Sequence, residues 1–166
     1  DIHLFGRRGP ADTKFSPREL AEFVDILGCD PVVAPADLSD VPASADGDTR
    51  RKLDLFRQFA AGRHRIGRRR CHFHFHHVPL AVLGSERVTG IRFRTDRPGE
   101  KPAIVDMPCG VLFRAIGYRG RQMPGLPFDE RAGSLRHCAG RLIAEDGTPV
   151  HGLYVAGWIK RGATGV

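Results

Sequence analysis

The sequence has no long apolar run. Within its 166 residues, no apolar stretch approaches the roughly 20 residues needed to cross a bilayer. The N-terminus also lacks the basic region and apolar segment of a signal peptide. These absences argue against a membrane protein and a secreted one, and we expect a soluble protein with no membrane partner.

Cysteine is scarce and scattered. The four cysteines, Cys29, Cys71, Cys109 and Cys138, form no CxxC pair. Neither a zinc ribbon nor a disulfide framework is therefore indicated. Reduced thiols in a cytoplasmic compartment are the preferred interpretation.

The composition is that of a globular protein with a basic surface. Hydrophobic residues make up 41% of the chain, enough for a packed core. The net charge of +7 comes almost entirely from arginine. Such a charge suits a phosphorylated ligand, an acidic protein or nucleic acid, and does not choose among them.

A glycine-flanked pair of arginines follows the first apolar segment. Ile2-His3-Leu4-Phe5 predicts a strand, and Gly6-Arg7-Arg8-Gly9-Pro10 follows it directly. A planar guanidinium can donate two parallel hydrogen bonds to a phosphate monoester. If the strand is parallel, arginine at its carboxyl end suits the 2′-phosphate of NADP. The alternative is a solvated turn with two exposed arginines.

Glu19 belongs to a helix start. Ser16-Pro17-Arg18-Glu19 has serine at the N-cap, proline at the first helical position and glutamate at the capping-box position. Apolar residues then recur at helical spacing, which predicts a helix over residues 17–27. Glu19 is explained by capping; its functional alternative is a hydrogen bond to a ribose hydroxyl or to one of the two arginines.

A histidine-rich run occupies residues 71–77. His72, His74 and His76 alternate with Phe73 and Phe75, which predicts a strand with its phenylalanines inward and its histidines outward. This period argues against an evolved zinc site, and no metal ligand is predicted. The preceding residues 63–70 contain five arginines without interleaved aromatic residues, which indicates a solvated loop or a protein-docking patch rather than an RNA site.

The middle and end of the chain read as strands and turns. Residues 87–93 and 103–106 predict an antiparallel hairpin around Arg97-Pro98-Gly99, and residues 111–117 predict a strand buried on both faces. A glycine- and proline-rich crossing between domains is expected over residues 118–127. The last residues resemble the approach to a helix whose body is missing, so we expect the chain to be truncated at both ends.

Four segments together resemble the adrenodoxin reductase-type ferredoxin–NADP reductases. They are Gly6-Arg7-Arg8-Gly9-Pro10 with Glu19 downstream, Ala115-Ile116-Gly117-Tyr118-Arg119-Gly120, Pro124-Gly125-Leu126-Pro127-Phe128-Asp129, and the segment from Tyr154-Val155-Ala156-Gly157-Trp158 through Ile159-Lys160-Arg161-Gly162-Ala163 to Thr164-Gly165-Val166. The last segment is highly specific, and all four occur in the family's order and spacing.

The resemblance implies an α/β fold: part of a flavoprotein with two dinucleotide-binding domains. Residues 1–116 would be the later part of a Rossmann-like NADP domain with an antiparallel β insertion, and residues 117–166 a piece of the FAD domain. The implied function is electron transfer between NADPH and ferredoxin, an acidic iron–sulfur protein, through FAD. No catalytic acid or base is implied, because the cofactor carries the chemistry.

The resemblance also implies roles for six residues. Arg7 and Arg8 would hold the 2′-phosphate of NADPH, with Glu19 lining the same site. Trp158, Gly165 and Val166 would contact FAD, with Gly165 between the flavin and the nicotinamide.

Two departures from the family pattern qualify this expectation. Ala163 stands where the family usually has proline, and both glycine-rich pyrophosphate loops are missing from these residues. We therefore expect the isolated chain to bind FAD poorly and to lack reductase activity. The alternative function is a non-catalytic basic module that binds an acidic protein or RNA.

Overall fold

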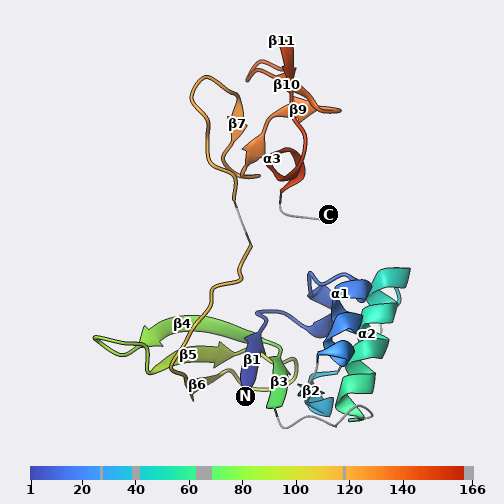
Figure 1. The fold of residues 1–166 in the computed structure, drawn as a ribbon, viewed down its shortest axis with the longest axis vertical. Coiled ribbons are helices and arrows are strands. Elements are labelled where there is room, and N and C mark those ends of the chain that lie inside the picture. The colour runs from blue at the N-terminus through green and yellow to red at the C-terminus, as the bar shows by residue number, and fades with distance from the viewer. Residues whose placement is uncertain (27, 39–41, 63–68, 118, 163–166) are drawn as a thin grey trace. The chain divides into compact units, whose positions relative to one another are not determined.

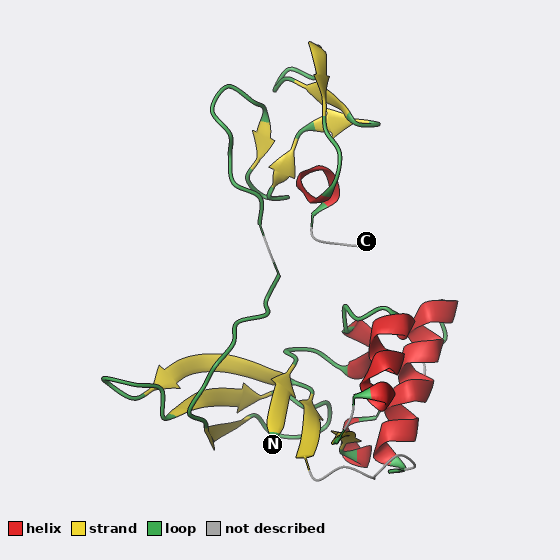
Figure 2. Ribbon diagram, viewed as in Figure 1, coloured by secondary structure: helices red, strands yellow, loops and turns green. Residues whose placement is uncertain are grey.

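The computed structural model describes residues 1–26, 28–38, 42–62, 69–117 and 119–162 (Figure 1). Helices and strands are mixed along the chain, as the predicted α/β class requires (Figure 2). The chain divides into two compact units, Asp1–Leu112 and Phe113–Val166. Each unit has a hydrophobic core of its own. No helix among the described residues is both long and apolar enough to cross a membrane.

A three-stranded parallel sheet organises the first unit. Its strands are β1 (Ile2–Phe5), β2 (Cys29–Val33) and β3 (Arg69–His74), in the order β1-β3-β2. Strand β3 pairs in parallel with both neighbours. The strand predicted at the start of the chain is confirmed, and its parallel pairing meets the condition for a ligand site at its carboxyl end.

Two helical segments connect these strands. Helix α1 (Pro17–Ala21) continues as the 3-10 helix η2 (Glu22–Asp25), so the helix predicted over residues 17–27 is shorter and tightens at its end. Helix α2 (Gly47–Ala60) begins after the N-cap Asp46, whose carboxylate accepts a hydrogen bond from the Thr49 amide at 2.7 Å. Two further 3-10 turns, η1 (Pro10–Asp12) and η3 (Pro35–Asp37), follow β1 and β2.

The first core lies between these helices and one face of the parallel sheet. Leu20 of α1, Phe56 and Phe59 of α2 and Phe73 of β3 are all buried in it. The ring of Phe73 meets that of Phe56 edge to face, with centroids 5.6 Å apart. The prediction that the phenylalanines of the histidine-rich run face inward is therefore confirmed.

The predicted histidine row is wrong at its last member. Strand β3 ends at His74, and His76 has φ of +59°, so the alternation of the strand does not reach it. His72 and His74 remain on the sheet face away from the core. The next histidine on that face is His3 of the neighbouring strand β1, whose ring stacks on both.

An antiparallel sheet follows the turn at His76. Its strands are β4 (His77–Leu83), β5 (Gly90–Thr95) and β6 (Ala103–Pro108), in sequential order. The predicted hairpin corresponds to β5 and β6 and is confirmed. Strand β4 was not predicted because Pro79, which cannot donate a ladder hydrogen bond, interrupts the pattern.

The buried strand predicted over residues 111–117 is wrong. No strand forms there, and Val111, Phe113 and Ile116 are 69%, 87% and 79% exposed. A continuous apolar run favours a buried strand only when neighbouring strands supply hydrogen bonds on both sides. No strand in the described part of the chain pairs with this segment.

The described residues of the second unit form a set of short strands and one short helix. The hairpin partners are β7 (Phe128–Asp129) and β8 (Ser134–Leu135), and a second sheet has the order β11-β10-β9. The latter comprises β9 (His137–Cys138), β10 (Arg141–Ile143) and β11 (Pro149–Tyr154). Leu135, Leu142 and Val155 form the core, against which Ile159 of helix α3 (Trp158–Arg161) packs.

Candidate functional site

The arginine pair lies in a loop held by the main chain. The Gly6 amide donates to the carbonyl of His74 at 2.8 Å, and the His77 amide donates to the carbonyl of Gly6 at 3.0 Å. The His76 amide donates to the carbonyl of Arg8 at 3.2 Å. The backbone of the loop is therefore fixed to the connection between β3 and β4.

The side chains of the pair face solvent at the carboxyl end of β1. Arg7 and Arg8 are both exposed. Arg8 makes one contact with Asp12 of η1, at 3.8 Å between Nη1 and Oδ1, and both side chains are at least half exposed. Such a surface pair is weak, so the guanidinium keeps donors for an anion. The geometry suits a phosphate at this edge of the sheet.

Gly9 gives the loop a close approach to a histidine. A β-carbon at Gly9 would lie 3.2 Å from Cε1 of His76, which is tighter than ordinary van der Waals contact. Glycine at this position therefore lets the imidazole of His76 lie against the backbone of the loop. The sequence motif marked Gly9 as a turn residue but not as the neighbour of His76.

Glu19 is engaged in the cap of α1. Its Oε2 accepts hydrogen bonds from the Ser16 amide at 2.7 Å and the Ser16 hydroxyl at 2.8 Å, and the Glu19 amide donates to Ser16 Oγ at 3.2 Å. The backbone hydrogen bond from Ser16 is the main reason that the pKa of Glu19 lies below its ordinary value. The capping interpretation is confirmed, while a contact with a dinucleotide stays a prediction.

A buried ion pair joins the two sheets of the first unit at the same edge. Asp37 of η3, just after the carboxyl end of β2, has a side chain only 1% exposed, and its Oδ1 lies 2.8 Å from Nε of Arg97 in the turn between β5 and β6. The two groups are close but not aligned as a hydrogen bond. Sequence reasoning missed this pair because no local pattern connects residues so far apart in the chain.

The second unit presents Trp158 at the first position of α3. Its side chain is 56% exposed. Gly157 before it has φ of +71°, a left-handed conformation that glycine adopts without strain. His137 Nε2 lies 2.8 Å from the carbonyl oxygen of Lys160, which ties the short helix to the sheet. Gly165 and Val166, and the departure at Ala163, lie outside the described residues.

With this geometry in view, the resemblance drawn from the motifs is confirmed. The chain is similar, over essentially its whole length, to ferredoxin–NADP reductases and to adrenodoxin reductase. The names of these relatives are those of reductases that use NADPH or NADP, and no family model matches the chain. The similarity includes both units, since the aligned region covers 99% or more of the chain.

Particular relatives show how far the similarity extends. A probable ferredoxin/ferredoxin–NADP reductase of Mycobacterium tuberculosis is 38% identical over 173 residues, which cover 99% of this chain and 29% of the relative. NADPH-ferredoxin reductase FprA of the same species is 34% identical and covered over 38% of its length. The mitochondrial NADPH:adrenodoxin oxidoreductase of Mus musculus is 32% identical and covered over 37%.

A solved structure agrees with these sequences. Mycobacterium tuberculosis FprA in complex with NADPH superposes with a TM-score of 0.76 at 32% identity, covering 99% of this chain and 38% of that one. The chain thus spans between about three tenths and two fifths of the length of the curated relatives it matches.

Proposed function

We propose that this chain supplies the adenosine-phosphate end of an NADP site and part of an FAD site in an FAD-dependent NADPH:ferredoxin oxidoreductase. The observation that carries the proposal is the exposed pair Arg7 and Arg8 on a fixed loop at the carboxyl end of a parallel strand. The similarity to FprA, solved with NADPH, supports it.

NADP fits the first unit by the chemistry of its donors. Arg7 and Arg8 would hold the 2′-phosphate through charge-assisted hydrogen bonds. Glu19 would line the same site, where the carboxylate lone pairs that its capping hydrogen bonds leave unused could accept hydrogen bonds from the dinucleotide. The finer fold proposal is that residues 1–116 form part of a Rossmann-like NADP domain and that the antiparallel sheet β4-β5-β6 is its insertion.

FAD fits the second unit at Trp158, whose exposed indole offers a planar surface to a ring system. Gly165 and Val166 are proposed as further contacts of residues 117–166 with the flavin. FAD held there would supply hydride acceptance from NADPH and release of single electrons, and the residues of this unit would orient it. The proposed electron acceptor is ferredoxin, an acidic partner suited to a chain of net charge +7.

The arginine pair is tested by titrating the chain with 2′-phospho-AMP and with AMP. We expect 2′-phospho-AMP to bind roughly tenfold tighter or more, because a hydrogen bond to a charged group contributes about 1.5–3 kcal/mol. Arg7→Ala and Arg8→Ala should each reduce this preference. Isothermal titration calorimetry measures both affinities.

Arg131→Ala is the matched control, since it removes one positive charge from an exposed position in the second unit. It should leave the preference intact. Equal affinity for the two nucleotides in the unaltered chain would contradict the proposal. The alternative of a basic module for an acidic protein or RNA is not favoured, because the similar proteins are reductases.

A further inference from the structure

A group of histidines lies on the face of the parallel sheet opposite the helices. His3 of β1 and His72 of β3 are direct register partners on adjacent strands. Adjacent strands lie about 4.8 Å apart, so side chains in register on one face meet. The two imidazole rings stack with centroids 4.8 Å apart and planes 9° from parallel.

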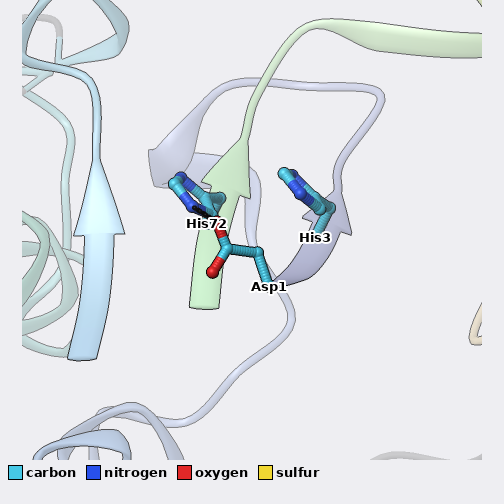
Figure 3. A group of neighbouring side chains, drawn as sticks. All are labelled: Asp1, His3 and His72. Atoms are coloured by element: carbon cyan, nitrogen blue, oxygen red, sulfur yellow. Dashed lines mark hydrogen bonds and ion pairs between the residues drawn. The ribbon is translucent and has the colours of Figure 1, made fainter. Parts of the chain in front are cut away.

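Asp1 adds a carboxylate to this pair. Its Oδ2 lies 3.2 Å from Nε2 of His72. One ligand atom from each of Asp1, His3 and His72 lies within 4.8 Å of the other two. Figure 3 shows the carboxylate of Asp1 directed at His72, with the ring of His3 on the neighbouring strand. Three donors, from β1, from β3 and from the residue just before β1, thus converge on one small volume.

His74 of β3 holds His3 from the side away from Asp1, toward the carboxyl ends of the two strands. Nδ1 of His3 and Nε2 of His74 are 2.9 Å apart, a hydrogen bond that uses one nitrogen of each ring. The other ring nitrogen of His3 can therefore give its lone pair to a metal ion. His74 is itself held between the ring of Phe5, with centroids 4.6 Å apart, and that of His77, at 5.5 Å. Metal-binding histidines commonly have their second nitrogen fixed by such a partner.

We propose that Asp1, His3 and His72 bind a divalent zinc-class cation and that His74 positions His3 as a ligand. Two imidazoles and one carboxylate form a donor set that zinc prefers, with water completing the tetrahedron. The lone pairs lie in the ring planes, so the ring of His72 must rotate about χ2 relative to that of His3 to meet one ion, while the hydrogen bond with His74 keeps His3 in place. That torsion is broad and soft.

This site differs from the proposed nucleotide site in position and in ligands. His3 and His72 lie toward the start of β1 and within β3, whereas Arg7 and Arg8 follow the carboxyl end of β1. It also differs from a row of His72, His74 and His76 along one strand, because the partner of His72 is in β1. An ion here would cross-link two strands between which the chain passes through α1, β2 and α2.

The test is zinc binding by the full 166-residue chain after treatment with a chelator. A free amino group at Asp1 is itself a metal ligand, so the protein is used with that amino group acetylated. We expect one zinc ion per chain by calorimetry and a higher Tm with zinc. Cobalt(II) should give the visible absorption of tetrahedral coordination.

The variants separate ligands from their support. His3→Ala and His72→Ala should abolish zinc binding, and Asp1→Asn should weaken it. Asp1 lies outside the core, so Asp1→Asn still tests the site if a histidine variant fails to fold. His74→Phe should weaken zinc binding by roughly ten- to a hundredfold while retaining the cobalt spectrum. His151→Ala, at an exposed position of β11, should change nothing.

Two results would overturn the proposal. One is that the acetylated chain takes up no zinc when the ion and the protein are present at comparable concentrations. The other is that His3→Ala, His72→Ala and Asp1→Asn all bind zinc as the unaltered chain does, which would place the ion elsewhere. Neither result bears on the preference for 2′-phospho-AMP, so the two proposals fail independently.

Discussion

Individual side chains decide how the edge of the parallel sheet is held. Arg97→Ala would leave the carboxylate of Asp37 buried without its cation. Loss of one partner of a buried pair is destabilising, and we expect the free energy of unfolding to fall by roughly 3 kcal/mol. Urea denaturation at neutral pH measures the change.

Arg92→Ala is the control for this prediction. Arg92 also pairs with a carboxylate, that of Asp106, at 2.7 Å, but on an exposed face of the antiparallel sheet. Its loss should change stability little because exposed pairs are screened by water. Equal effects of the two substitutions would show that burial of Asp37 does not matter.

Burial also sets the reactivity of the thiols. Cys71 is buried in the first core, and desolvation, with the neighbouring Cys29, raises its pKa to about 11. Since the thiolate is the nucleophile, Cys71 should resist alkylation at pH 8, whereas the exposed Cys138 should react readily. N-ethylmaleimide labelling followed by peptide mass spectrometry gives both rates. Labelling of Cys71 as fast as that of Cys138 would contradict the buried position.

At the scale of elements, the capping box of α1 makes a separable contribution. Ser16→Ala removes the acceptor for the Glu19 amide and one of the two donors to the Glu19 carboxylate, and it should lower the free energy of unfolding by about 1 kcal/mol. Thermal unfolding measures it. If Glu19 also contacts the dinucleotide, Glu19→Gln should weaken binding of 2′-phospho-AMP more than Ser16→Ala does.

The same cap makes stability depend on acid. The pKa of Glu19 is lowered in the folded chain, chiefly by the backbone hydrogen bond from Ser16. Its stabilisation is therefore present above the ordinary pKa of 4.5 and is lost as the pH falls through the lowered value. The stability difference between the unaltered chain and Glu19→Gln should shrink in that acid range. A difference that is constant down to the lowest pH would contradict this assignment.

At the scale of the whole chain, the boundary between the two units carries exposed apolar residues. Phe113 is 87% exposed and Leu112 is 41% exposed, whereas Phe56 and Phe59 are buried in the first core. Brief chymotrypsin treatment should therefore cut beside Leu112 or Phe113 first. Mass spectrometry identifies the fragments, and Phe113→Gly should slow the cut. Initial cleavage at Phe56 or Phe59 would contradict the packed core.

Flavin binding is also a property of the whole chain. The 166 residues contain no G-x-G-x-x-G loop to hold a pyrophosphate at a helix N-terminus. We expect the purified chain to bind FAD weakly and to show no NADPH-dependent reduction of ferredoxin. Flavin released on denaturation is quantified by fluorescence. Tight, stoichiometric flavin would show that contacts such as Trp158 suffice.

Much of the local structure follows from the sequence itself. The strand before Gly6, the cap at Ser16 and Glu19, the hairpin of β5 and β6 and the inward phenylalanines of β3 each depend on residues close together in the chain. Steric preference, capping and the two-residue period of strands determine these features locally. The resemblance to reductases was likewise visible in short motifs whose order needs no coordinates.

Only the tertiary structure decided which distant residues meet. It placed His3 beside His72, buried Asp37 against Arg97, brought His76 to Gly9 and left the apolar residues 111–117 without a partner strand. Sequence periodicity specifies the face of a strand but not its neighbour. The neighbour is selected by hydrophobic packing and backbone hydrogen bonds summed over the whole unit.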